Sequence, residues 1–251
     1  MNTTNQRRTV ASISVVGPGR VGRAAALALR SAGFSVSGPS GRRDDIVASE
    51  VVLVCVPDRE IAAAVAASRD RARFVGHTSG ATSLAAVAAD FSVHPLRAFT
   101  GHESADAFEG IGCAVAGATP DALAVATELA LALGGEPFAV SEEQRAGYHA
   151  AASIASNFLV TLAAAAEQMG AASGLPSDEF RRHLVPLVRG TVDNWAEHGP
   201  RAALTGPIAR GDERTVERQR AAVAEAAPEL LALFDELSER TRALARTETP
   251  E

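Results

Sequence analysis

The chain has 251 residues, 47% of them hydrophobic, so it is long enough for two modest globular domains. Its net charge of −6 gives no support to binding of nucleic acid or anionic membranes. All 24 basic residues are arginine, which excludes any mechanism that needs a lysine ammonium, a lysine Schiff base or a phosphate-binding lysine.

Cysteine usage and hydropathy indicate a cytoplasmic protein. Cys55 and Cys113 lie in apolar runs, and we expect them to be reduced thiols in the core rather than a disulfide. No apolar run is expected to approach the length of a membrane span, and "MNTTNQRRTV" lacks the apolar segment of a signal peptide. The histidines and cysteines show no HxxxH or CxxC spacing, so we expect no metal site.

In the first half of the chain, short apolar runs alternate with helical patterns. This alternation predicts a mostly parallel sheet with crossover helices, an α/β Rossmann-like domain over residues 1–141. The predicted strands are, in chain order, "ASISVV", "FSVS", "VVLVCV", "RFVGH", "FSVH", "CAVAG" and "PFAV".

From Ser141 onward the patterns predict only helices, forming an all-helical domain over residues 142–251. "SEEQ" at 141–144 has the form of a capping box, and Pro186 is expected to kink the second helix. The predicted helices span 142–168, 178–197, 213–226 and 229–246.

A glycine-rich loop follows the first predicted strand. "SVVGPGRVG" contains Gly17-x-Gly19-x-x-Gly22 between a strand and an amphipathic helix. Gly17 permits a tight turn, Gly19 lets a pyrophosphate approach the backbone, and Gly22 lets helix and strand pack closely. The pattern predicts dinucleotide binding; the alternative is a glycine-rich turn in a domain that has lost its cofactor. The expected cofactor contacts are Gly17, Pro18, Gly19, Arg20, Val21 and Gly22.

The segment after the second predicted strand favours NADP over NAD. An NAD site would place an acidic residue near Ser37, where this strand is expected to end. "SGPSGRRDD" instead offers Ser40, Arg42 and Arg43 to a 2′-phosphate. The alternative is a solvated loop in which the two following aspartates neutralise the arginines. Between Ser37 and Val51 there is no room for a crossover helix and another strand, so we expect the strand-3 unit to be missing or vestigial.

Two further strand ends are expected to contact the cofactor, because ligands bind beyond the carboxyl ends of the strands in such sheets. "VVLVCVPD" ends in a turn expected beside the nicotinamide ribose, and "FVGHTSG" ends in a second turn. The expected contacts are Val56, Pro57, Asp58, His77 and Thr78. Ser79 is a candidate substrate contact, with the alternative that it or Thr82 caps the following helix.

"FSVHPLRAFTG" places His94 at a strand end where the nicotinamide ring is expected. The titration range of imidazole suits proton exchange, which makes His94 a candidate catalytic residue. The alternative is a histidine that caps a turn through a ring nitrogen.

Residues 148–158, "YHAAASIASNF", combine neutral polar groups on one predicted helix. At about 100° per residue, His149, Ser153 and Asn157 share roughly a quarter of the helix circumference. Buried neutral polar groups need hydrogen-bond partners, which could be core residues or a ligand.

"LTGPIARGDERT" is a further candidate, in which Thr205 lies in a turn and Arg210 could bind a substrate carboxylate bidentately. The alternatives are an Arg–Asp structural pair and a helix-capping role for Asp212.

The motifs "GPGRVG", "VPD", "HTSG", "HPLRAF", "YHAAASIASNF", "PLVRGTVDN" and "LTGPIARGD" together resemble a family of two-domain proteins without an assigned reaction. These proteins join a Rossmann-like NAD(P)-binding half to a helical domain of unknown function and are grouped as candidate oxidoreductases. The chain is more distantly similar to ketopantoate reductase, pyrroline-carboxylate reductase, hydroxyacid dehydrogenase and prephenate dehydrogenase. The resemblance implies a helical domain similar to the C-terminal domain of 6-phosphogluconate dehydrogenase, a homodimer formed through that domain, and a substrate bound between the domains.

The resemblance also implies residue roles. "HPLRAFTG" is similar to the His-Pro motif of prephenate dehydrogenases, in which the histidine engages the reacting hydroxyl. Ketopantoate reductases use a Lys-x-x-x-Asn pair, to which Ser153 and Asn157 correspond here. Because serine stands in the lysine position, His149 is the candidate proton donor, with Tyr148 beside it as a substrate contact.

These observations predict an NADP-dependent oxidoreductase that acts on a small carboxylate-bearing carbonyl or imine compound, with a ketopantoate-like 2-keto acid as the expected substrate. One alternative is a dinucleotide-binding sensor or structural dimer without turnover. Another is oxidation in the manner of prephenate dehydrogenase.

Overall fold

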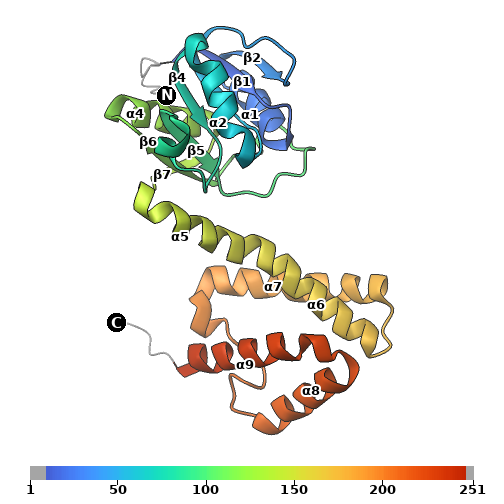
Figure 1. Ribbon diagram of the computed structural model, residues 1–251. Helices are drawn as coiled ribbons and strands as arrows, with labels where there is room; N and C mark the ends of the chain where they lie inside the picture. Colours follow the sequence, from blue (N-terminus) through green and yellow to red (C-terminus); the bar gives the residue numbers. More distant parts are fainter. Residues whose placement is uncertain (1–9, 247–251) are drawn as a thin grey trace, which may run out of the picture. The chain divides into compact units, whose positions relative to one another are not determined.

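The computed structural model describes residues 10–246. The chain divides into two compact units, Met1–Ser156 and Asn157–Glu251 (Figure 1). The boundary between the units lies within a long helical segment, later in the chain than the domain boundary predicted at residue 141. The first helix of the predicted helical domain therefore belongs to the same compact unit as the sheet.

Seven strands form one sheet in the order β2-β1-β3-β4-β5-β6-β7. Neighbouring strands run parallel except β5 and β6, which are antiparallel, so the predicted Rossmann-like fold class is confirmed. Cys55 and Cys113 are buried free thiols, as predicted. The strands are β1 (Ser12–Val16), β2 (Ser35–Ser40), β3 (Ser49–Val54), β4 (Ala72–His77), β5 (Phe91–Pro95), β6 (Gly112–Gly117) and β7 (Glu136–Ala139).

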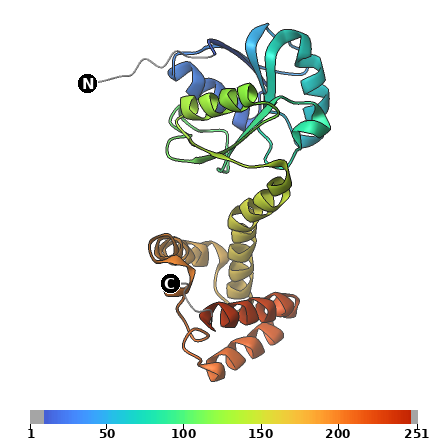
Figure 2. The ribbon, with the colours of Figure 1, turned by 90° about the vertical axis from the view of Figure 1, so that its left-hand side faces the viewer.

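Both faces of the sheet are covered, because successive side chains of a strand point to opposite faces. In β3, Val51 and Leu53 belong to one buried cluster, whereas Val52 and Val54 belong to the other. This double burial explains why the central strands are continuous apolar runs. Helices α1 (Arg20–Ser31) and α4 (Pro120–Leu133) pack on the first face, and α2 (Asp58–Ser68), η1 (Arg69–Arg71) and α3 (Leu84–Val87) follow on the second (Figure 2).

The edge of the sheet at β2 lacks the usual third strand. Among residues 10–246, β2 pairs only with β1, and the opposite side of β1 pairs with β3. Residues 41–48 join β2 to β3 without a helix, which confirms that the strand-3 unit is missing. The second strand ends at Ser40, somewhat later than the predicted end near Ser37.

The helices after residue 141 follow the predicted boundaries closely. Ser141 caps the first of them with a complete capping box, in which its side chain and that of Gln144 each accept from the other residue's backbone N–H. Asp212 caps the helix that begins at Glu213, which supports the capping alternative for this residue. The elements are α5 (Glu142–Ser153), the π-helix η2 (Ile154–Phe158), α6 (Leu159–Ala172), α7 (Ser177–Ala202), α8 (Glu213–Ala226), η3 (Pro228–Leu230) and α9 (Leu231–Arg246).

Helix α7 is interrupted at Gly199, where the backbone is non-helical, with φ 76° and ψ 173°, immediately before Pro200. Pro186 lies inside the helix, and the kink predicted there stays a prediction. A positive φ is accessible to glycine, and the residue before a proline disfavours the α conformation, so the Gly–Pro pair explains the interruption.

The polar stripe predicted along 148–158 does not keep an α-helical spacing throughout. Residues Ile154–Phe158 form a π-helix, whose wider turn places fewer than 100° between successive residues. The prediction that Asn157 shares a face with His149 and Ser153 assumed an uninterrupted α-helix. Because a π-turn holds between four and five residues, Asn157, four residues after Ser153, still falls within about a quarter turn of it, so the shared face stays a prediction.

The helical segment Glu142–Ala172 is long and apolar enough to cross a membrane by length and composition, with a window of mean hydropathy 1.4. This corrects the expectation that no apolar run approaches such a length. One such helix is weak evidence for a membrane span, because helices of soluble proteins pass the same test. None of the window is buried, and the apolar side chains of Ile154, Phe158 and Val160 are more than half exposed.

Candidate functional site

The glycine loop between β1 and α1 has the close contacts that its sequence predicts. Gly17 has a φ of 109°, and a Cβ atom there would lie 2.4 Å from the carbonyl oxygen of Cys55. A Cβ on Gly22 would lie 1.9 Å from the carbonyl oxygen of Gly17. Any larger residue at either position would push the loop away from β3 and α1.

Gly19 has a different environment, which suits a phosphate group. It is the N-cap of α1, and no side chain caps the helix there. A Cβ atom built on Gly19 would have the Cys55 carbonyl oxygen as its nearest neighbour, at 3.9 Å. The first N–H groups of α1 are thus accessible, and the helix N-terminus favours negative charge. Gly19 lines a cavity of about 740 Å³ together with Gly17 and Pro18. The loop therefore fits a dinucleotide pyrophosphate.

Only two of the three residues predicted to bind a 2′-phosphate line this first cavity. Ser40 and Arg42 line it, whereas Arg43 does not. The guanidinium of Arg42 forms an ion pair with the carboxylate of Glu60, which also lines the cavity. The partner of Arg42 is thus not one of the aspartates that follow it: Asp44 accepts a hydrogen bond from the Gly41 N–H at 2.7 Å.

A second cavity of about 420 Å³ adjoins the first, since Gly19 and Pro57 line both. Several of the predicted cofactor and substrate contacts lie on its wall. His94 and His149 line it, which brings the two candidate catalytic histidines together. The other predicted contacts on this wall are Arg20, Val21, Val56, Asp58, Thr78 and Ser79.

His77 is not on the wall of either cavity. Its side chain is fully buried, its Nδ1 accepts the N–H of Ser79 at 3.2 Å, and its Nε2 has no partner among the described residues. Burial, reinforced by the charge of Arg145, lowers the pKa of His77 to about 4. His77 is therefore a neutral core residue that shapes the loop after β4, and its predicted contact with the cofactor has no support from its position.

Ser79 and Thr82 do not cap the following helix, because the N-cap of α3 is Ser83, but Ser79 stabilises the turn before it. The Ser79 hydroxyl accepts the N–H groups of Ala81 at 3.2 Å and Thr82 at 3.0 Å. The hydroxyl is thus engaged in the turn before α3, although Ser79 lies on the cavity wall.

His94, on the wall of the second cavity, is hydrogen-bonded to Tyr148, a predicted substrate contact that is not among the residues lining that cavity. The Tyr148 hydroxyl lies 2.6 Å from His94 Nδ1, with the two rings edge to face. Burial raises the pKa of Tyr148 to about 12, so its hydroxyl stays protonated. The hydroxyl therefore donates a hydrogen bond to Nδ1. Burial, with the neighbouring charges of His149 and Arg145, lowers the pKa of His94 to about 4. His94 is therefore neutral near pH 7, with its own proton on Nε2.

Gly80 makes room for this arrangement. A Cβ on Gly80 would lie 2.7 Å from His94 Nδ1 and 3.0 Å from His149 Cδ2. The ring centroids of His94 and His149 are 6.0 Å apart. The glycine of "HTSG" thus permits β5 and α5 to place their polar side chains side by side.

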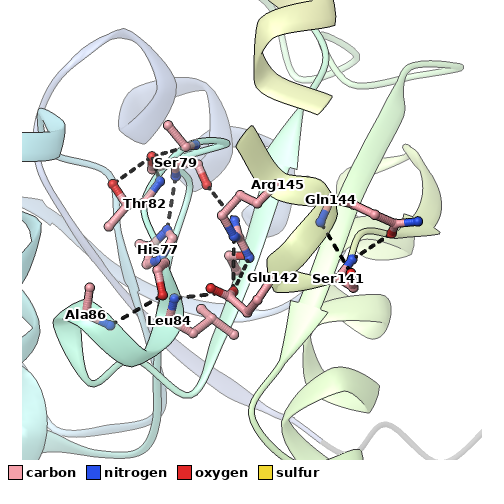
Figure 3. Close-up of polar contacts among 12 residues, drawn as sticks. His77, Ser79, Thr82, Leu84, Ala86, Ser141, Glu142, Gln144 and Arg145 are labelled. Atoms are coloured by element: carbon pink, nitrogen blue, oxygen red, sulfur yellow. Dashed lines mark hydrogen bonds and ion pairs between the residues drawn. The ribbon is translucent and has the colours of Figure 1, made fainter. Parts of the chain in front are cut away.

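Arg145 anchors α5 to the strand ends (Figure 3). It is 5% exposed, and its guanidinium donates to Glu142 Oε1 at 3.1 Å, to Ser92 Oγ at 3.1 Å and to the Ser79 carbonyl at 3.5 Å. Glu142 in turn accepts the backbone N–H of Leu84 at 3.4 Å. One arginine therefore holds the helix that bears Tyr148 against the strand that bears His94.

The remaining predicted residues lie elsewhere. Ser153 is the last residue of α5 and is half-buried, whereas Asn157 is exposed within the π-helix and belongs to the second unit. Thr205 and Arg210 are exposed residues of the segment that precedes α8. Their predicted roles remain predictions, because the cavity with His94 is built from the first unit.

Sequence reasoning missed Glu60, Arg97 and Arg145. Glu60 lies in the first turn of α2, and Arg145 lies in the first turn of α5. Both turns are rich in charged residues, a pattern typical of solvated helix ends. Arg97 lies within the quoted motif "HPLRAF", so its closeness to His94 in the sequence was an available signal.

No curated protein matches the chain. Among solved structures, TM1727 from Thermotoga maritima aligns with a TM-score of 0.77 and 26% identity over 93% of this chain and 98% of its own. BF3122 from Bacteroides fragilis, a candidate NADP oxidoreductase, aligns with a TM-score of 0.76 and 21% identity over the same shares. Prephenate dehydrogenase from A. aeolicus, solved with hydroxyphenyl propionate and NAD+, aligns with a TM-score of 0.55 and 14% identity over 95% of this chain and 99% of its own.

These likenesses confirm the Rossmann-like fold that the motifs predicted. The family model for the domain of unknown function DUF2520 matches residues 111–241, which is more than half of the chain. This match covers the strand after His94, helix α5 with Tyr148 and His149, and most of the second unit. The chain belongs to the DUF2520 family.

Proposed function

We propose that the protein is an NADP-dependent oxidoreductase that transfers hydride between the nicotinamide and a small carboxylate-bearing carbonyl or imine compound. One observation carries the proposal: the cavity at the glycine loop adjoins the cavity lined by His94, whose Nδ1 is hydrogen-bonded to Tyr148. A dinucleotide on the loop would direct its reactive end toward these side chains, as expected at the carboxyl ends of a parallel sheet. A ketopantoate-like 2-keto acid remains the expected substrate.

The bound cofactor would supply the hydride, and the residues of the chain would handle the charge on the substrate. In the reductive direction, the carbonyl oxygen becomes negative as the carbon is reduced. The neutral ring of His94 donates a hydrogen bond from Nε2 to that oxygen, because Tyr148 occupies Nδ1. His94 is a poor source of an imidazolium proton because its pKa is lowered to about 4. We therefore assign proton delivery to His149, which lines the same cavity.

The experiment that tests cofactor binding is the substitution Gly19→Ala. The added methyl group has space in the free protein, since its nearest neighbour is 3.9 Å away, but it would occupy the surface that a pyrophosphate must approach. We expect unchanged thermal stability and a loss of NADPH affinity of about tenfold or more, measured by the fluorescence of bound NADPH. A tenfold loss corresponds to about 1.4 kcal/mol.

The matched control is Gly147→Ala in α5, where nothing lies within 4 Å of the new Cβ. This variant should bind NADPH as the wild type does and gain about 0.5–1 kcal/mol of stability, because alanine is favoured over glycine inside a helix. Equal NADPH binding by the Gly19→Ala and wild-type proteins would contradict the loop assignment. Tight NADPH binding without oxidation by a broad panel of keto acids would favour the sensor alternative.

The Arg42–Glu60 ion pair leads to a prediction about cofactor preference. A 2′-phosphate would have to displace Glu60 from Arg42, and the carboxylate would repel it. We expect Glu60→Gln to tighten NADPH binding about three- to tenfold and to leave NADH binding little changed, since one screened surface contact is altered.

Arg42→Ala, alone or with Arg43→Ala, should remove the preference for NADPH over NADH. The measurement is the ratio of the two dissociation constants in each variant. A preference for NADH in the wild type that persists in both arginine variants would defeat the assignment of NADP.

We also propose that the protein forms a homodimer through its helical unit. Large apolar side chains on α6 and α7 are exposed, more than an isolated monomer commonly leaves in solvent. Light scattering should give twice the mass of the chain, and Trp195→Glu should lower it toward that of the monomer. The exposed residues that support this proposal are Leu159, Val160, Leu187, Val192 and Trp195.

A further inference from the structure

Arg97 lies on the wall of the second cavity with His94 and His149. It follows β5 directly, in the motif "HPLR", and its backbone N–H donates to the Pro95 carbonyl at 2.8 Å. The neighbouring Leu96 N–H donates to the Gly112 carbonyl at 2.9 Å. The backbone that carries Arg97 is therefore tied to the end of the sheet.

The guanidinium of Arg97 is fixed at one corner only. Its Nη1 donates to the carbonyl oxygen of Ala107 at 2.6 Å. Ala107 and Phe108 are both buried, at 3% and 0% exposure, so this acceptor belongs to the rigid core. A guanidinium has five N–H donors in a planar fork, and this contact leaves most of them for a ligand.

The charge of Arg97 is not compensated within the described chain. Several other arginines have carboxylate partners, for example Arg145 with Glu142 and Arg69 with Asp90. Among residues 10–246, no carboxylate forms an ion pair with Arg97. A fixed cation with free donors on a cavity wall favours an anion with two acceptor oxygens, such as a carboxylate.

We propose that Arg97 binds the carboxylate of the substrate and thereby presents the adjacent carbonyl to His94. This inference rests on the proposed oxidoreductase function and names its substrate class: small 2-oxo acids. The cavity of about 420 Å³ must also accept the nicotinamide end of the cofactor, which limits the acid to a few carbon atoms. Arg97 lines the same cavity as His94. Arg210, the carboxylate-binding residue that the sequence suggested, does not line that cavity.

The test is calorimetric titration of the NADPH-loaded protein with pyruvate, 2-oxobutanoate and 3-methyl-2-oxobutanoate, and with the methyl ester of each. We expect Arg97→Ala to weaken binding of the acids by about 10- to 100-fold, the usual cost of losing a charge-assisted hydrogen-bonded pair. Binding of the esters and of NADPH should not change. Arg97→Lys should recover only part of the affinity, because an ammonium lacks the planar fork.

The matched control is Arg71→Ala, which removes the same charge from a residue that is exposed, as Arg97 is, but lines neither cavity, and this variant should bind the acids as the wild type does. Equal losses for acids and esters, or for both alanine variants, would overturn the proposal. So would failure of every acid to bind wild-type protein that holds NADPH. Failure of NADPH itself to bind would instead defeat the proposed function, and titration of the free protein with the same acids would still test Arg97.

Discussion

Substitution of His94 by asparagine is expected to slow hydride transfer by about 100- to 1,000-fold, the usual cost of removing one hydrogen-bond donor to a developing oxyanion. The asparagine side chain can still accept the Tyr148 hydroxyl in place of Nδ1, but it has no group where Nε2 lies. The variant thus keeps the contact between β5 and α5 and removes the donor aimed at the substrate. The measurement is single-turnover oxidation of bound NADPH by the best 2-oxo acid.

Two companion variants separate the roles within the pair. His94→Gln restores an amide near the position of Nε2 but cannot reach the Tyr148 hydroxyl, so we expect a partial recovery of rate. Tyr148→Phe leaves the imidazole free to adopt either tautomer and should cost less than removal of the ring. NADPH affinity should be unchanged in all three. Turnover that survives both His94→Ala and His149→Ala would remove the acid–base assignment.

Substitution of Arg145 by methionine is expected to lower the free energy of unfolding by about 3 kcal/mol at pH 7, as when one partner of a buried ion pair is removed. The loss has an identifiable origin, because the buried Ser92 hydroxyl and the Ser79 carbonyl would each lose a donor. Arg145→Lys should retain more stability than Arg145→Met, but only a minor part of the lost free energy of unfolding should be recovered. Urea unfolding followed by circular dichroism gives the values.

The same variant should change how stability depends on pH. In the folded wild type, the pKa values of His77 and His94 are both about 4, below the ordinary value of 6.5. The unfolded chain therefore binds more protons, and stability falls as pH decreases from about 6.5 toward 4. The charge of Arg145 contributes to both lowered values, so its removal should raise them and weaken this pH dependence. NMR titration of the histidine rings measures the shift directly.

A matched control for Arg145 is Arg181→Met, which removes an arginine that pairs with Glu167 in the second unit and is well exposed. We expect this substitution to cost less than about 1 kcal/mol, because exposed ion pairs contribute little. It should leave the pH dependence unchanged. Equal effects of the two substitutions would show that Arg145 acts only as one more surface charge.

The fold could be predicted because its elements carry local signals. The central strands are short apolar runs, α8 was predicted with its observed bounds, and the glycines of the loop have the contacts that their spacing implies. His94 and His149 were also predicted, because a strand end and a polar helix turn are visible in the sequence.

The missed residues depend on partners that lie far away in the chain. Arg145 meets Ser79 and Ser92, and Arg42 meets Glu60, through turns whose geometry no local pattern specifies. His77 was misplaced for a related reason: a strand end gives the position of a residue but not the face to which it points, and here that face is the core. The π-helix at Ile154–Phe158 was also not predicted, because no local pattern in these five residues distinguishes it from an α-helix.

The missing strand beyond β2 has a practical consequence for handling the protein. In a complete doubly wound sheet, further chain would enclose the adenosine end of a bound dinucleotide, whereas here only the short connection 41–48 follows β2. A spacer arm attached to the adenine ring would meet little steric hindrance on leaving this edge. With the proposed NADP binding, the protein is expected to be retained on agarose carrying adenine-linked NADP and to elute with free NADP; passage through the column without retention would contradict the proposal.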